Sequence, residues 1–346
     1  MVFPKGTPGD GSGQKLNMGE RIFVSGATGF IGSRLVEKLA ENGAIVHALY
    51  RSEAKADLIR KDGVYLFKGD ILDEESVSSA MKGCDLAYHV AAFAGIWSKD
   101  PSLIFRLNVD GALNVVRAAA NCGTRRVLIT STAGILGPSD KVAVDEKTPT
   151  PASFFTTYEA SKSLMEKKLG ELSSPIPEVL IVNPTRVYGP GVLSESNRVT
   201  RMIGKYLNGK WKLIPGDGNS SGNYVHVEDV VKGHLLAMEK GKPGERYVLG
   251  GENITYNQLF DLTRKIGRVN FRLFHVPLWL MLSLASMMGL WTRLTGVPPL
   301  ILPGLVKKIN HNWIVSSEKA IKELGYNPRS AHEGIADCFK WFRQIS

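Results

Sequence analysis

Tyr158 and Lys162 are the two residues of this sequence whose types and spacing most clearly predict chemistry. Their stretch has the spacing of a helix, so positions i and i+4 place the phenol and the ammonium group on one face. A neighbouring cation lowers the pKa of a phenol from about 10, which makes the hydroxyl usable as a general acid or base. Tyr206 and Lys210 have the same spacing, and we interpret that second pair as structural. The first pair predicts proton transfer by Tyr158.

Polar residues upstream distinguish Tyr158 from Tyr206. Ser131 and Thr132 come directly after a short apolar stretch that is typical of a strand, and Asn108 lies in an earlier helical stretch. A hydroxyl pair at a strand end, followed by the tyrosine and lysine, makes Tyr158 the stronger catalytic candidate.

A glycine-rich turn, SGATGFIG over residues 25–32, separates the first apolar stretch from the first helical stretch. Glycines there let the backbone turn tightly and approach a pyrophosphate, which then lies at the N-terminus of the helix. The spacing is GxxGxxG, and its place between strand and helix predicts dinucleotide binding. The residues expected to contact the dinucleotide are Gly26, Thr28, Gly29, Phe30, Ile31 and Gly32.

The end of the second strand-like stretch, residues 44–50, should select between NAD and NADP. An acidic residue at this end binds the ribose 2′-hydroxyl of NAD, but the chain has none there. Arg51 follows instead, and a guanidinium can pair with a 2′-phosphate. We therefore predict NADP(H), with NAD(H) as the alternative if Arg51 is a solvated loop residue.

Strand-like and helix-like stretches alternate in the first half of the chain, which predicts βαβ units. The fold class expected is α/β, a doubly wound parallel (Rossmann) sheet covered on both faces, with right-handed crossovers. The expected elements are residues 21–25, 31–42, 44–50, 64–68, 85–90, 103–121, 127–130, 158–172 and 179–182.

Domain boundaries follow from the change of rhythm after Pro184. We expect a flexible leader over residues 1–19, a dinucleotide-binding domain over 20–188 and a smaller, mainly substrate-binding lobe over 189–346. The segments 224–227 and 246–249 are expected to return to the main sheet.

Composition excludes several classes of protein. The 346 residues are 43% hydrophobic and 22% charged, which is ordinary for a globular enzyme. The formal net charge is +10, but the basic residues form no cluster, so we predict no nucleic-acid partner. The three cysteines indicate reduced thiols and a cytoplasmic protein. No His, Cys and Asp group has metal-ligand spacing, so we predict no metal.

Residues 276–292 contain no charged side chain. The stretch is shorter than the about 20 apolar residues that span a membrane, so we predict a buried or pocket-lining helix. A helix that lies on a membrane surface is the alternative, and it would make the protein membrane-associated.

The sequence resembles the extended short-chain dehydrogenases/reductases, from about Arg21 to the C-terminus. Within that family it is most similar to the dihydroflavonol 4-reductase-like group, which includes 3β-hydroxysteroid dehydrogenases, farnesol dehydrogenase-like proteins and hopanoid-associated epimerase-like proteins. The motifs that carry the resemblance are SGATGFIG, residues 69–71, 89–92, 108–111 and 131–134, YEASK, NPTRVYGPG, and residues 224–230, 244–251 and 323–329.

This resemblance implies a role for each matching residue. Tyr158 would be the proton donor or base, and Lys162 would hold the nicotinamide ribose. Thr132 would orient the carbonyl oxygen, with Ser131 as the neighbouring alternative, and Asn108 would support the lysine. Further residues implied to lie against the cofactor are Asp70, Ile71, Ala91, Ala92, Pro184 and Val187. Asp70 could instead cap a turn and Asn108 could be a helix-interior residue, and we interpret His89 as a packed strand residue and place His226 outside the catalytic set.

Five aromatic residues are expected to line an apolar substrate pocket: Phe93, Trp97, Phe154, Phe155 and Tyr188. Nucleotide-sugar epimerases of the resembled family commonly carry an Arg before the returning strand, where the chain has residues 221–224 without one. Arg198 and Arg201 could take its place.

The leading hypothesis is an NAD(P)(H)-dependent oxidoreductase that acts on an apolar carbonyl or alcohol, dihydroflavonol-, steroid- or isoprenoid-like. The alternatives are a sugar epimerase or dehydratase that retains NAD, and a non-catalytic dinucleotide-binding protein. The resemblance also implies a homodimer.

Overall fold

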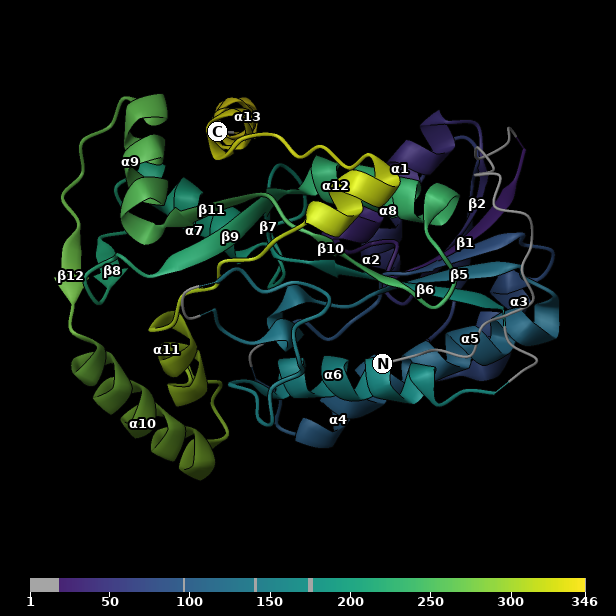
Figure 1. The fold of residues 1–346 in the computed structure, drawn as a ribbon, viewed down its shortest axis with the longest axis horizontal. Coiled ribbons are helices and arrows are strands. Elements are labelled where there is room, and N and C mark those ends of the chain that lie inside the picture. Colours follow the sequence, from purple (N-terminus) through teal and green to yellow (C-terminus); the bar gives the residue numbers. More distant parts are fainter. Residues whose placement is uncertain (1–18, 96, 140–141, 174–176, 346) are drawn as a thin grey trace.

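The computed structural model describes residues 19–95, 97–139, 142–173 and 177–345, so the expected leader lies outside the described residues except for Gly19. Seven strands form the main sheet in the order β10-β6-β5-β4-β1-β2-β3, and every pairing is parallel (Figure 1). The strands are β1 (Arg21–Ser25), β2 (Ile45–Tyr50), β3 (Val64–Lys68), β4 (Leu86–His89), β5 (Arg126–Thr130), β6 (Glu178–Pro184) and β10 (Arg246–Leu249). The predicted parallel sheet is confirmed.

Helices cover both faces of this sheet, because alternate strand residues point to opposite sides. Ile22 and Val24 of β1 belong to one hydrophobic core, and Phe23 between them belongs to the other. The first core is closed by α1 (Phe30–Glu41), α8 (Val227–Lys240) and α12 (Glu318–Leu324). The second is closed by α3 (Glu74–Met81), α5 (Gly111–Cys122) and α6 (Thr157–Gly170). The sheet is therefore doubly wound, with α8, α12 and β10 supplied by the second half of the chain (Figure 1).

Two smaller sheets lie beyond the main one. β7 (Arg186–Tyr188), β9 (Ser221–His226) and β11 (Glu252–Thr255) form one, and β8 (Leu213–Pro215) pairs with β12 (Phe274–Val276) in the other. Residues 246–249 return to the main sheet as predicted, but the same prediction for 224–227 is wrong. β9 pairs with β7 and β11, outside the main sheet.

The remaining helices belong mostly to the C-terminal lobe. α7 (Arg198–Leu207), α9 (Tyr256–Gly267) and α13 (Ala331–Ile345) surround a third core that contains Ile203, Leu259 and Ile335. α10 (Leu278–Thr295) and α11 (Pro303–Ile309) lie at the periphery, away from the main sheet (Figure 1). The short helical segments are α2 (Glu53–Ala56), α4 (Pro101–Phe105), a π-helical segment (Arg106–Asp110) and two 3-10 turns (Asp57–Ile59, Ala133–Leu136).

The apolar stretch 276–292 differs from the prediction of a buried helix. It forms most of α10, in which only Ala285 and Thr292 are buried. No helix in the described part of the chain is long and apolar enough to cross a membrane.

Candidate active site

The glycine-rich turn lies where the strand order of the main sheet changes direction, between β1 and β4. Gly26 has φ +72°, and a Cβ there would lie 2.5 Å from the backbone nitrogen of Ala91. A Cβ on Gly32 would collide with the Gly26 carbonyl, so both positions require glycine. Gly29 begins α1 without a side-chain cap, which leaves the helix N-terminus open to a phosphate. This backbone cradle fits a dinucleotide pyrophosphate.

Arg51 and Asp70 lie after neighbouring strands, β2 and β3, beside this turn. The Arg51 side chain is 72% exposed, and its Nη1 lies 3.8 Å from Asp70 Oδ2. Asp70 also caps its own turn, since its Oδ1 accepts a hydrogen bond of 3.0 Å from the Leu72 backbone N–H. Ile71 is buried in the core, where it packs against Gly111 of α5. Arg51 thus has a loosely held guanidinium that is free to meet an added anion.

Tyr158 lies in the first turn of α6, where the side chain of Thr132 interacts with its hydroxyl. The Ser131 hydroxyl is buried and has no hydrogen-bond partner among the described residues. The geometry therefore favours Thr132 over Ser131 as the partner of the tyrosine. Burial raises the pKa of Tyr158 to about 12, with a further rise from the Glu159 carboxylate, against the hydrogen bond from Thr132. Lys162 is not among the groups that shift this pKa, and its ammonium group is bonded instead to the Thr130 carbonyl.

Lys162 lies one turn further along α6 and is fully buried. Its Nζ donates a hydrogen bond of 2.8 Å to the Thr130 carbonyl at the end of β5. Burial lowers the Lys162 pKa to about 8, and the carboxylate of Glu166 opposes that shift. Glu166 was not predicted, although it lies four residues after Lys162 on the same helix face. It accepts a hydrogen bond of 2.7 Å from Asn183 Nδ2, which ties α6 to β6.

Asn108 lies in the π-helical segment and links three parts of the site. Its Oδ1 accepts a hydrogen bond of 2.7 Å from the Phe93 backbone N–H, and its Nδ2 donates one of 2.8 Å to Ser161 Oγ. Ser161 in turn donates to the Tyr158 carbonyl over 2.7 Å. Asn108 therefore positions the catalytic turn of α6 against the loop after β4.

Two histidines lie near these residues and are held neutral. His89 is fully buried, and its Nδ1 lies 2.8 Å from Ser25 Oγ. Burial lowers the His89 pKa to about 3, and the charge of Lys162 adds to that shift. Burial likewise lowers the pKa of His226 to about 3. Both observations agree with packed side chains rather than proton carriers.

The remaining residues expected at the cofactor lie at the same edge of the sheet. Ala91 packs against Gly26, while Ala92 is exposed. Pro184 is buried at the end of β6 and pairs with Leu249 of β10. Val187 lies in β7, partly buried.

The predicted pocket aromatics do not share one environment. Phe93 and Trp97 are partly buried in the loop after β4. Phe155 is partly buried, with its ring centroid 5.1 Å from that of His311. Phe154, in contrast, packs against a core cluster that contains Ile135 and Val315.

Tyr188 has a different place from the one predicted. It is 1% exposed and belongs to the third core, where its hydroxyl lies against Gly334 of α13. Its ring is core rather than pocket wall, because α13 covers it.

Two cations that the sequence analysis missed lie near the catalytic turn. Arg186 Nη1 donates to the hydroxyls of Tyr224 (3.0 Å) and Tyr256 (3.5 Å), and a Cβ on Gly222 would collide with its guanidinium. Arg186 of β7 thus places its guanidinium against Gly222, within the segment 221–224 that lacks the expected Arg.

Lys308 of α11 is the second cation, and it forms an ion pair with Glu159, the neighbour of Tyr158. Burial lowers the Lys308 pKa, and the charges of Arg186 and Arg198 lower it further, against Glu159. Positive charge from Arg186, Arg198 and Lys308 is therefore gathered near Glu159.

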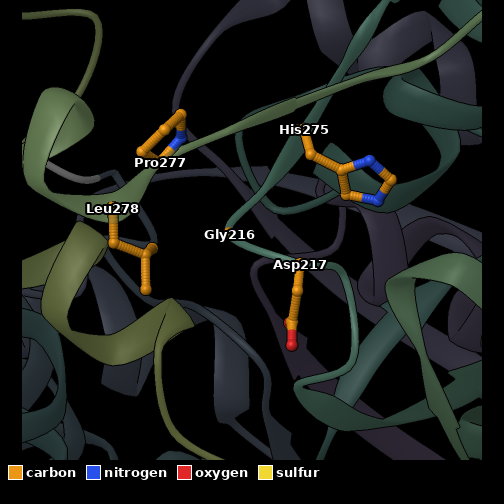
Figure 2. Close-up of a pocket in the computed structure, with 5 residues that line it drawn as sticks. All are labelled: Gly216, Asp217, His275, Pro277 and Leu278. Carbon is orange, nitrogen blue, oxygen red and sulfur yellow. The ribbon is translucent and has the colours of Figure 1, made fainter.

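A surface hollow occurs elsewhere, where α10 begins (Figure 2). It is lined by Gly216, Asp217, His275, Pro277 and Leu278. None of these residues touches the catalytic set, so we do not assign catalysis to it. Among the described residues no group of His, Cys, Asp and Glu could hold a metal ion.

Comparisons with known proteins agree with this geometry. Residues 22–250 match the model of the NAD dependent epimerase/dehydratase family. The chain is 32% identical to the sterol demethylase protein B of Methylococcus capsulatus, over 93% of this chain and 98% of that protein. It is 27% identical to the sterol-4-alpha-carboxylate 3-dehydrogenase, decarboxylating, of Dictyostelium discoideum, over 89% and 96%.

Among solved structures, the UDP-glucose 4-epimerase of Thermotoga maritima superposes with a TM-score of 0.78 at 26% identity, covering 94% of this chain and 99% of that one. The chain therefore belongs to the NAD dependent epimerase/dehydratase family of extended short-chain dehydrogenases/reductases, whose members depend on a nicotinamide dinucleotide.

Proposed function

We propose that this protein is an NADP(H)-dependent oxidoreductase that reduces a carbonyl, or oxidises an alcohol, on an apolar substrate. The observation that carries the proposal is the placement of Tyr158 beside Thr132 and one helical turn from Lys162, at the edge of a sheet that carries a dinucleotide cradle. Net oxidation or reduction is also what the names of the Methylococcus and Dictyostelium relatives suggest.

The residues divide the chemistry between them. A nicotinamide dinucleotide, when bound, supplies or accepts the hydride. In the reducing direction Tyr158 gives its hydroxyl proton to the carbonyl oxygen, so the substrate gains one hydride on carbon and one proton on oxygen. Thr132 orients that oxygen, and Lys162, one helical turn from Tyr158, would hold the nicotinamide ribose. A Tyr158 pKa of about 12 keeps the proton in place at neutral pH until it is needed.

Arg51 supports the choice of NADP(H). The last residues of β2, Leu49 and Tyr50, are not acidic, and Arg51 presents an exposed guanidinium beside the cradle. Asp70 is the nearest acid, and its 3.8 Å contact with Arg51 is weak enough for a phosphate to replace.

A second candidate function is epimerisation of a nucleotide sugar. Arg186 favours it, because this guanidinium has only phenol partners among the described residues and is well suited to a diphosphate. Under this function hydride would return to the same substrate, with no net redox change.

Isotope transfer separates the two functions. NADPH carrying deuterium at the transferred position is incubated with a panel of long-chain ketones, sterol ketones and flavonoid ketones, and with UDP-glucose. We expect deuterium on the carbinol carbon of at least one apolar alcohol product. Conversion of UDP-glucose to an epimer without consumption of NADPH, and no apolar product, would contradict the proposal.

Two partner predictions remain proposals. One is a homodimer, and the other is peripheral membrane contact through residues 276–292, which the exposure of α10 supports.

A further inference from the structure

α10 presents a stripe of apolar side chains to solvent. Leu280, Leu284, Met287, Trp291 and Leu294 recur at alternating spacings of four and three residues, which is the spacing of one helix face, and all five are exposed. Trp291 is 63% and Leu294 76% exposed. Most of the exposed large hydrophobic residues in the described part of the chain lie between residues 271 and 300. A contiguous apolar surface of this kind marks an interaction site.

The chain segment that contains this stripe carries charge of one sign. The sequence contains no Asp or Glu between Asp261 and Glu318. Arg264 and Lys265 pair with Asp261, and Lys308 pairs with Glu159. The basic residues of this interval that are exposed and have no carboxylate partner among the described residues are Arg268, Arg272, Arg293 and Lys307. Asp217, from outside this segment, lies in the hollow at the start of α10, but the segment itself is basic and complements an anionic partner.

Lipid fits this combination better than a second copy of the chain. Arg293 is the only charged residue of α10, so two copies would lack the opposite charges that pair helices along an apolar seam. Two like-charged surroundings would also repel each other. Exposed tryptophans, an apolar face and flanking cations are the features of helices that lie in the plane of a membrane interface. α10 carries all three, with Trp279 and Trp291 toward its two ends.

The residues that follow α10 contact the first turn of α6 and the residues just before it. A Cβ on Gly304, at the start of α11, would collide with the Phe155 carbonyl, and Lys308 pairs with Glu159. The ring of Phe155 contacts those of His311 and Trp313. α11 therefore contacts Phe155 and Glu159 on either side of Tyr158 in the sequence, and α10 packs against α11.

We propose that α10 docks in the headgroup region of an anionic bilayer and that the substrate reaches Tyr158 from that bilayer. The docking stands alone, whereas the route of the substrate rests on the proposed function. The substrate would then be a ketone or alcohol apolar enough to dissolve in lipid.

Docking is tested by co-sedimentation of the full chain with vesicles. We expect the protein to pellet with vesicles of phosphatidylcholine and phosphatidylglycerol, and to bind at least about tenfold more weakly to phosphatidylcholine alone or in about 1 M NaCl, where charge is screened. The triple variant Met287→Gln, Trp291→Gln, Leu294→Gln should lose binding. The control Leu58→Gln, Ile321→Gln changes two exposed apolar residues elsewhere and should bind like the parent.

Each other outcome overturns docking. The protein could fail to pellet with anionic vesicles, or the triple and control variants could bind equally. Analytical ultracentrifugation could also show a dimer that only the triple variant dissociates, which would assign α10 to a second copy. Matching thermal unfolding of both variants excludes misfolding as the cause.

The route is tested with pentadecanone, either dissolved in anionic vesicles or solubilised by detergent. We expect the triple variant to lose about tenfold or more of the turnover in vesicles and to keep turnover in detergent. Equal effects in both media would overturn the route. Vesicle binding without turnover of any ketone in either medium would sustain docking and overturn both the route and the proposed function.

Discussion

The carboxyl edge of the main sheet and the surface of α10 differ in which side chains they bury and which they expose to solvent. At the edge, polar groups are buried and joined to one another: Lys162 to Thr130, and Asn108 to Ser161. On α10, large apolar groups such as Leu294 face solvent, and only two of its residues are buried. A fold buries apolar surface wherever it can, because burial stabilises by about 25 cal/mol per Å².

The contrast indicates two kinds of constraint. The buried polar edge is costly unless every group finds a partner, so its composition is set by chemistry at one point. Exposed apolar side chains are unfavourable in water. We therefore attribute the composition of α10 to the bilayer that we propose as its partner. Each of the following variants alters one side of this contrast and should leave the other unchanged.

Tyr158→Phe should have the largest effect. Loss of the general acid should lower turnover by about 10²–10⁴-fold while NADPH binding is retained. Tyr206→Phe is the matched control, because Tyr206 is buried and, within the described part of the chain, its hydroxyl donates to the Phe271 carbonyl alone. If steady-state turnover falls equally in both variants, Tyr158 is not the general acid.

Gly26→Ala should come next. The added Cβ would press on Ala91 at a positive φ, so we expect NADPH affinity to fall by about tenfold or more. Gly123→Ala is the control, since Gly123 also has a positive φ (+70°) but a Cβ added there would have no atom within 4 Å. It should cost about 1 kcal/mol of stability with unchanged affinity, measured by fluorescence titration and denaturant unfolding.

Arg51→Gln should change the choice of cofactor. The ratio of kcat/KM for NADPH to that for NADH should fall by roughly tenfold, because one charge-assisted hydrogen bond to phosphate is lost. Arg60→Gln, another exposed arginine, should leave the ratio unchanged. If the ratio is unchanged in Arg51→Gln, Arg51 is a solvated loop residue that does not bind the 2′-phosphate.

The last prediction concerns pH and stability. Burial lowers the pKa of His89 and His226 to about 3 and that of His234 to about 4. Below about pH 6.5 the unfolded chain binds protons that the folded chain does not, so stability is lost as pH falls toward 4, by about 1.4 kcal/mol per pH unit for each of these histidines. Tm measured at pH 7, 6, 5 and 4 should decrease. His332→Gln, an exposed control, should show the same decrease as the parent.

Much of the fold and part of the site could be predicted from local sequence. β3 occupies the predicted residues Val64–Lys68, and the glycine turn and the Tyr158–Lys162 helix lie where expected, because these signals are local. Arg186 and Lys308 could not be predicted, since segments far apart in the chain bring them to the site. The pKa of Tyr158 was predicted with the wrong sign, because spacing reports a neighbouring cation but not burial.

The exposure of α10 was also beyond local pattern. The sequence of an apolar helix is similar whether the helix packs against protein or against lipid. Only the tertiary structure shows which of its faces are exposed. β9 is a similar case, because its own residues do not show that it pairs with β7 and β11 rather than with the main sheet.

Cofactor retention on the purified protein tests the central claim most directly. Native mass spectrometry is carried out after NADPH and NADH are offered in turn and then removed by desalting. An oxidoreductase that releases its coenzyme in every cycle should exchange the dinucleotide freely and prefer NADPH. A retained NAD that neither desalting nor added NADPH displaces would contradict the account and favour an enzyme that returns its hydride to the same substrate.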